Sequence, residues 1–165
     1  MTDDERRAAR AARVTTPSDR EIVIERVFEG RRERVFAAYT DPDLIPLWWG
    51  LRDADVIVDE MDLRPGGAWR FVSRNQDGSE EAFKGTYREV VPPERIVYTF
   101  EWEGAPGQVL VETVAFEDLG ERTKVTTTAL FDTPEERDEM LESGMEAGMT
   151  ETYEQLDELL ADDRS

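Results

Sequence analysis

The order of apolar and polar positions between residues 20 and 48 predicts a strand followed by two short helices. In residues 20–28, "REIVIERVF", alternate positions form two faces, one with Ile22, Ile24, Arg26 and Phe28 and the other with Val23, Glu25 and Val27. A period of two residues is typical of a β-strand. The apolar spacing then becomes helical in residues 31–39, and Asp41 followed by a proline predicts that a second helix begins there and covers residues 42–48.

Six further apolar segments, each bounded by a turn signal, predict six more strands. They span residues 54–63, 68–74, 82–91, 95–102, 108–117 and 122–131. Because the connections have the length of hairpins, neighbouring strands are expected to be antiparallel. The segment "RPGG" predicts a turn between two strands and not a phosphate-binding loop, since neither a helix nor a Gly-Lys-Ser/Thr ending follows it.

Residues 133–161 predict one long helix that closes the chain. Thr133, Pro134 and Glu136 stand where a capping box with proline at the first helical position would place them. An apolar stripe with helical spacing follows, formed by Met145, Met149, Leu156 and Leu160, with Thr152 or Tyr153 between them. The expected fold class is therefore α+β, a curved seven-stranded antiparallel sheet covered by one long helix, with two short helices after the first strand.

The start of the chain differs in composition from the rest. Residues 1–18 are rich in alanine and arginine and have almost no apolar face, so we expect a mobile arm. The sequence thus predicts a single domain over residues 19–161, followed by a short tail at 162–165.

Charge and composition exclude several classes of function. The 165 residues include 39 Asp and Glu against 20 Lys and Arg, a net charge of −19, which disfavours binding to nucleic acid. Cysteine and histidine are both absent, so disulfides, thiolate nucleophiles, zinc–sulfur sites and histidine-based catalysis are excluded. We expect no cofactor and no metal. Without a membrane span or a signal peptide, the chain is expected to be a cytoplasmic monomer or homodimer.

Five segments resemble one known family. They are "TDPDLIPLWWG", "MDLRPGGAWRFV", "DGSEEAFKGTYREVVPPERIVYTFEW", "VAFEDLGERTKVT" and "SGMEAGMTETYEQLDELL". In order and spacing they are similar to the bacterial family related to the C-terminal domain of the activator of Hsp90 ATPase. This family belongs to the START-like, or polyketide cyclase-like (SRPBCC), helix-grip superfamily. The resemblance covers roughly residues 20–161.

The resemblance implies a curved sheet that grips its C-terminal helix, with an apolar cavity between them. Its members bind or transform hydrophobic small molecules, so we expect a ligand-binding protein for a hydrophobic or aromatic small molecule. Where relatives usually carry Gly-Trp in the last helix, this chain has Gly148 and Met149, so a flexible thioether replaces an aromatic ring that would face the cavity.

Two other functions are alternatives. One is an enzyme of the polyketide cyclase or hydrolase type, in which Tyr87, Tyr98 or Glu112 would position a substrate and transfer protons. The other is an activator of an Hsp90-type chaperone. An Hsp90 homologue is not an expected partner, because the eukaryotic activators add a separate N-terminal domain that engages the chaperone.

Alternation along the strands predicts the inner wall of the cavity. Aromatic residues gather on one face of each strand, and that face is expected to point inward. The ligand-binding candidates on the strands are Trp69, Phe71, Tyr87, Tyr98, Phe100 and Trp102, and those on the last helix are Met145, Met149 and Tyr153. The same alternation aligns Glu89 with Tyr87. The simpler alternative is that these rings only fill the core.

Two charged residues fall on faces that are otherwise apolar. Arg26 shares a strand face with Ile24 and Phe28, and Glu112 shares one with Val114. A buried charge destabilises the fold by several kcal/mol unless it has a partner. We therefore expect Arg26, Glu112 or both to form a polar end of the cavity. The alternative is that Glu112 is solvated at a margin of the sheet and Arg26 pairs with a surface acid.

The adjacent residues Trp48 and Trp49 cannot share one role. Neighbouring side chains at the end of a helix point about 100° apart. We expect Trp48 to pack the short helix onto the sheet and Trp49 to lie at the rim of the cavity.

Overall fold

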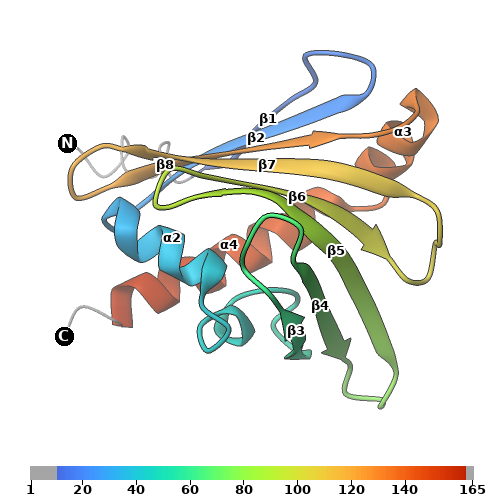
Figure 1. The fold of residues 1–165 in the computed structure, drawn as a ribbon, viewed down its shortest axis with the longest axis horizontal. Helices are drawn as coiled ribbons and strands as arrows, with labels where there is room; N and C mark the ends of the chain where they lie inside the picture. The colour runs from blue at the N-terminus through green and yellow to red at the C-terminus, as the bar shows by residue number, and fades with distance from the viewer. Residues whose placement is uncertain (1–10, 163–165) are drawn as a thin grey trace.

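The computed structural model describes residues 11–162, which form an eight-stranded sheet with helices on one side of it (Figure 1). The strands are β1 (Arg13–Thr15), β2 (Glu21–Phe28), β3 (Asp55–Met61), β4 (Ala68–Arg74), β5 (Glu80–Val91), β6 (Arg95–Trp102), β7 (Val109–Asp118) and β8 (Thr123–Leu130). The helices are α2 (Arg32–Thr40), the short 3₁₀ helix η1 (Ile45–Leu47), α3 (Pro134–Glu142) and α4 (Met145–Asp162). The predicted α+β helix-grip fold is confirmed.

All neighbouring strands are antiparallel, in the order β1-β2-β8-β7-β6-β5-β4-β3. The seven predicted strands are present, and β1 is an eighth that the sequence did not predict. It lies in the segment predicted as an arm, where Val14 pairs with Ile24 of β2. Three residues are too few for an alternating pattern, so β1 is defined only by pairing with the edge of β2. Residues 1–10 of the predicted arm and 163–165 of the predicted tail lie outside the described residues.

A β-bulge changes the inner face of β5. The register of β5 against β6 shifts between Tyr87 and Glu89, so the extra residue inverts the alternation beyond it. Val90 therefore packs against the core, while Glu89 forms an ion pair with Arg95. The predicted alignment of Glu89 with Tyr87 was wrong, because simple alternation takes no account of a bulge.

Two of the three predicted helices need correction, while the first, over 31–39, is present as α2. Only η1 is helical within the predicted second helix, and Asp41 is the C-cap of α2; its side chain accepts a hydrogen bond from the backbone N–H of Asp43 over 2.9 Å. The predicted long C-terminal helix is divided into α3 and α4 at Gly144, whose φ of +84° favours glycine. The predicted N-terminal cap of α3 is confirmed, since the hydroxyl of Thr133 accepts a hydrogen bond from the backbone N–H of Glu136.

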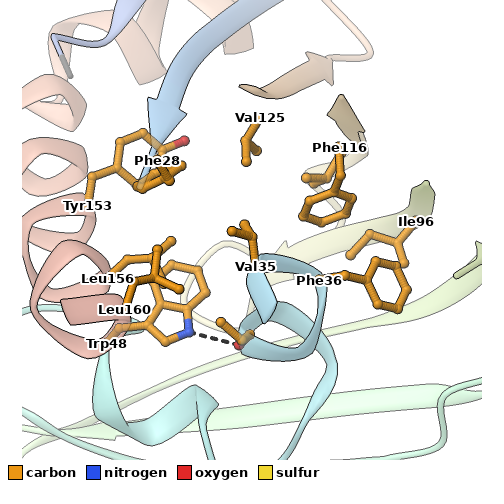
Figure 2. Packing of buried hydrophobic residues seen from close by; sticks show 12 residues of the cluster. Phe28, Val35, Phe36, Trp48, Ile96, Phe116, Val125, Tyr153, Leu156 and Leu160 are labelled. Atoms are coloured by element: carbon orange, nitrogen blue, oxygen red, sulfur yellow. Dashed lines mark hydrogen bonds between the residues drawn. The ribbon is translucent and has the colours of Figure 1, made fainter. Parts of the chain in front are cut away.

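Helix α4 crosses the sheet with α2 beside it, and their apolar side chains meet those of the strands (Figure 1). Figure 2 shows Leu156 and Leu160 of α4 beside Trp48, and Tyr153 pointing toward Phe28 of β2. The rings of Phe28 and Tyr153 meet edge to face, with centroids 5.2 Å apart. This main core fixes α4 and α2 on the sheet. A second apolar cluster lies around Trp69 and Phe71 of β4.

Candidate functional site

A cavity of about 170 Å³ lies between the sheet and the chain segment that runs from the end of α2 through η1. Eight of its eleven lining residues are aromatic. The lining consists of Tyr39, Ile45, Trp48, Trp49, Trp69, Phe71, Tyr87, Ile96, Tyr98, Phe100 and Glu112. The sequence placed a cavity between the sheet and the C-terminal helix, but in the described part of the chain no lining residue belongs to α4.

The wall on β4 depends on a glycine in the next strand. Trp69 lies opposite Gly85 of β5, and its indole N–H donates to the backbone carbonyl of Thr99 over 3.2 Å. A Cβ on Gly85 would lie 1.8 Å from that carbonyl oxygen and 2.7 Å from Nε1 of Trp69. Gly85 therefore leaves the space in which the indole crosses β5 to reach β6.

The two adjacent tryptophans are divided between core and cavity. Trp48 is 3% exposed, and its Nε1–H donates to the carbonyl oxygen of Ala38 over 2.8 Å, the dashed line in Figure 2. Its predicted packing role is confirmed, although one edge of the ring also lines the cavity. Trp49 is half-buried and meets Phe71 and Phe83 with centroids 5.2 Å away in each case. Its role as a rim for ligand entry stays a prediction.

Among the lining residues that the structure describes, Glu112 provides the only carboxylate. It lies in the middle of β7, directly opposite Tyr98 of β6, and the Tyr98 hydroxyl donates to its Oε2 over 2.6 Å. An O–H donor at that distance is typical of a bond to a charged acceptor. The alternative that Glu112 is solvated at a sheet margin is wrong, because β7 has neighbours on both sides and the side chain faces the cavity.

Burial changes the acid–base properties of this cluster. It raises the pKa of Glu112, while the hydrogen bond from Tyr98 opposes that rise. It also raises the pKa of Tyr98 and Tyr39, and the nearby Glu112 charge raises both further. The pKa of Tyr153 is raised to about 12, mainly by burial. The tyrosines are therefore protonated at neutral pH, and Glu112 is the group whose charge can change.

Arg26 has a partner and does not line the cavity. Its guanidinium binds Asp157 of α4 through two hydrogen bonds, 2.7 and 2.6 Å long, and lies 4.5 Å from the ring centroid of Phe28. The Arg26 side chain is 6% exposed and that of Asp157 is 27% exposed. The alternative proposed from the sequence, a pair with an acid near the surface, describes this contact. It links the sheet to the helix that crosses it.

Seven of the twelve candidate residues meet at the cavity, and five do not. The seven are Trp49, Trp69, Phe71, Tyr87, Tyr98, Phe100 and Glu112. Besides Arg26, the residues that lie elsewhere are Tyr153 and Met149, which pack in the main core, Met145, which packs against a third apolar cluster near Ile22, and Trp102, which is 42% exposed. Trp102 borders a second hollow of about 170 Å³ between β6, β7 and α3. Phe100 lies between the two hollows and contributes to both.

Four lining residues were not among the ligand-binding candidates, namely Tyr39, Ile45, Trp48 and Ile96, although strand alternation had aligned Ile96 with Tyr98 and Phe100. Ile45 is the first residue of η1, Trp48 is its C-cap, and Ile96 begins the inner face of β6. Tyr39 follows Val35 and Phe36 with helical spacing, so its inward direction was visible in the sequence. Its place at the cavity was not, because that depends on how the end of α2 meets β7.

Two further searches of residues 11–162 gave negative results. No group of three or more His, Cys, Asp or Glu side chains is arranged to hold a metal ion. Within the same range, no helix has the length and apolar character needed to cross a membrane.

Comparisons with known proteins identify a matching family and solved structures with the same fold. A family model described as "Activator of Hsp90 ATPase homolog 1-like protein" matches residues 30–161. A crystal structure of a Rhodobacter sphaeroides protein is similar, with 25% identity, a TM-score of 0.86, and coverage of 91% of this chain and 97% of that chain. A solution structure from Arthrobacter aurescens has 26% identity, a TM-score of 0.83 and 93% coverage of both chains.

A more distant structure shares the fold alone. It is DynU16, described as a putative protein in the dynemicin biosynthetic locus, with 18% identity and a TM-score of 0.67. The match covers 88% of this chain and 48% of DynU16. A search of the curated proteins found no match.

Proposed function

Since this chain belongs to the family of activator of Hsp90 ATPase homolog 1-like proteins, we propose that it binds a small hydrophobic or aromatic molecule in the cavity beside Glu112. The observation that carries the proposal is a cavity walled by aromatic rings with one hydrogen-bonded carboxylate in it. Ligand sites commonly combine an apolar lining with a few polar groups that orient the ligand. The Tyr98–Glu112 pair is that polar group here.

The volume of the cavity limits the size of the ligand. An apolar cavity of about 150 Å³ holds one benzene molecule, whereas sites for drug-sized ligands are about 300–1,000 Å³. At about 170 Å³, the cavity fits a molecule with one ring. We therefore expect one-ring compounds to bind without rearrangement, and two-ring compounds to require displacement of η1 or of Trp49.

Tryptophan fluorescence provides a direct measurement. Three of the four tryptophans, Trp48, Trp49 and Trp69, line the cavity, and Trp102 does not. We expect benzyl alcohol to change the emission in a saturable manner and to raise the melting temperature, because a ligand that binds only the folded state stabilises it. Naphthalene methanol, with two rings, should bind more weakly.

Two matched substitutions test whether the cavity is the site. Trp49→Ala removes a half-buried wall and should weaken benzyl alcohol binding with a modest loss of stability, whereas Trp102→Ala should leave binding unchanged. Trp48→Ala should instead lower the free energy of unfolding by about 3–5 kcal/mol. A saturable signal that persists in Trp49→Ala and disappears in Trp102→Ala would move the site to the second hollow. No saturable signal from any one-ring probe would contradict the proposal.

The Tyr98–Glu112 pair also favours a second candidate, an enzyme that uses proton transfer. A carboxyl group with a raised pKa that accepts from a tyrosine is a plausible general base, since catalytic acids and bases work best when their pKa is near the operating pH. Mass spectrometry of ligands before and after incubation separates the two candidates. A binding protein returns its ligand unchanged. An enzyme converts it, and Tyr98→Phe slows that conversion more than it weakens binding.

A further inference from the structure

The cavity holds a negative charge that the protein itself does not neutralise. Glu112 accepts one hydrogen bond, from Tyr98, and within residues 11–162 it has no ion pair. Arg26, a buried cation of the same core, is already held by both carboxylate oxygens of Asp157. A carboxylate that is partly removed from water without a counter-charge is unfavourable, and either a proton or a cationic ligand would relieve that cost.

The rest of the wall also favours a positive charge. Aromatic rings carry negative potential on their faces and attract ammonium groups within about 6 Å of the ring centre. Eight aromatic side chains surround the cavity, and no lysine or arginine lines it in the described part of the chain. Edge-to-face contacts, such as that between Trp69 and Tyr98 at 5.8 Å, fix the rings in place before a ligand arrives.

The donors that an anionic ligand would need are largely committed elsewhere. The indole N–H of Trp48 donates to the carbonyl of Ala38, and that of Trp69 to the carbonyl of Thr99. The Tyr98 hydroxyl donates to Glu112. Tyr87 and Trp49 keep neutral donors for which no hydrogen bond is found in the described range, so the cavity offers an acceptor, ring faces and neutral donors, while the charge of Glu112 repels carboxylates and phosphates.

From this arrangement we infer that the ligand is a small cationic amine, whose ammonium group binds Glu112 and whose one-ring or similarly sized apolar body contacts the aromatic wall. The inference rests on the proposed function and narrows its ligand class. The contact between the ammonium group and Glu112 gives the buried carboxylate the counter-charge that the protein does not provide.

Three probes of the same size and different charge test the inference: benzylammonium, benzyl alcohol and benzoate. Binding is measured by titration calorimetry together with tryptophan fluorescence. Benzylammonium should bind about tenfold more tightly than benzyl alcohol, the effect of about 1.4 kcal/mol expected from a charge contact and cation–π contacts together. Benzoate should not bind.

Glu112→Gln is the decisive variant, since it keeps the size of the side chain and removes the charge. It should abolish the preference for benzylammonium while benzyl alcohol still binds. Glu136→Gln, at an acid that borders the second hollow, is the matched control for attraction by the acidic surface and should leave the preference intact.

The outcomes separate this inference from the proposed function. Benzyl alcohol that binds wild-type protein as tightly as benzylammonium overturns the cationic ligand and leaves the binding function standing. A preference that survives Glu112→Gln also overturns it. If none of the three probes binds, the binding function fails as well. The wild-type series needs no variant, so the test remains decisive even if Glu112→Gln does not fold.

Discussion

Arg26 and Glu112 are both charged residues on apolar strand faces, but their side chains have different partners in the structure. Arg26 meets Asp157 of α4 in a two-bond ion pair and contacts the ring of Phe28. Within residues 11–162, the one hydrogen-bond partner of the Glu112 side chain is the neutral hydroxyl of Tyr98, and Glu112 faces a cavity. A paired charge connects elements of the fold, whereas an unpaired charge beside a cavity leaves room for a ligand to pair with it. The difference indicates which of the two belongs to structure and which to the candidate site.

Among the substitutions that alter the partners of Arg26 and Glu112, the largest effect on stability is expected from Asp157→Asn. This change leaves the guanidinium of Arg26 buried without its counter-charge, and breaking a buried pair costs about 3–5 kcal/mol; because Asp157 is partly exposed, we expect about 2–3 kcal/mol. Urea unfolding measures the loss. Ligand binding should be unaffected in the folded protein, since neither residue lines the cavity.

The next residue on α4 supplies the control for that substitution. Glu158 also forms a two-bond pair with an arginine, Arg52, but both side chains are about half exposed, at 57% and 47%. Glu158→Gln should therefore change the unfolding free energy much less than Asp157→Asn does. Equal losses in Asp157→Asn and Glu158→Gln would mean that the Arg26 pair is no more structural than a surface contact.

A smaller effect is expected from Tyr98→Phe, which removes the donor to Glu112. Hydrogen bonds to charged groups contribute about 1.5–3 kcal/mol, and water entering the cavity replaces part of this, so we expect a loss of about 1 kcal/mol. The pKa of Glu112 should rise further, because the hydrogen bond now lowers it. Tyr87→Phe is the control, since Tyr87 lines the same cavity and no hydrogen bond of its hydroxyl is found in the described range. Equal losses in the two variants would contradict a specific role for the Tyr98 bond.

The smallest effect, and the one with an unusual sign, is expected from Glu112→Gln. Burial raises the pKa of Glu112 above its usual 4.5, so the folded state binds this proton more tightly than the unfolded state. The stabilisation that comes from this tighter proton binding is complete below about pH 4.5, and it is lost as the pH rises through the pKa of Glu112 in the folded state. The variant should therefore gain stability relative to wild type as the pH rises above about 4.5, measured by urea unfolding. A constant difference across that range would show that Glu112 does not carry an unfavourable charge.

Much of the cavity wall could be predicted from the sequence, because strand alternation is a local property. Trp69, Phe71 and Tyr98 face inward as their positions in the strands predict. The same rule was wrong for Glu89, where the bulge inverts the faces, and it did not help at Trp102, where β6 extends beyond the covered part of the sheet and the ring is exposed. Alternation gives the face of a strand but not the point at which other elements stop covering it.

The helices show where prediction from the sequence ended. The stripe on the last helix was correctly identified as buried, yet Met149 and Tyr153 face the core and not the cavity. Tyr39, on the other hand, lines the cavity although its spacing indicates only that it is buried. A helical stripe defines which side of a helix is buried, while its neighbours across the interface depend on how the helix sits on the sheet.

The sequence by itself determined seven of the eight described strands, their antiparallel pairing, the cap at Thr133 and the inward direction of Arg26 and Glu112, because each depends on residues close together in the chain. Only the tertiary structure decided that Asp157 neutralises Arg26, and that no corresponding cation reaches Glu112 within the described residues. Residues 26 and 157 are far apart in sequence and meet because α4 crosses the sheet at that point. The partner of a buried charge depends on the packing of distant elements, and it is this packing that leaves Glu112 facing the cavity.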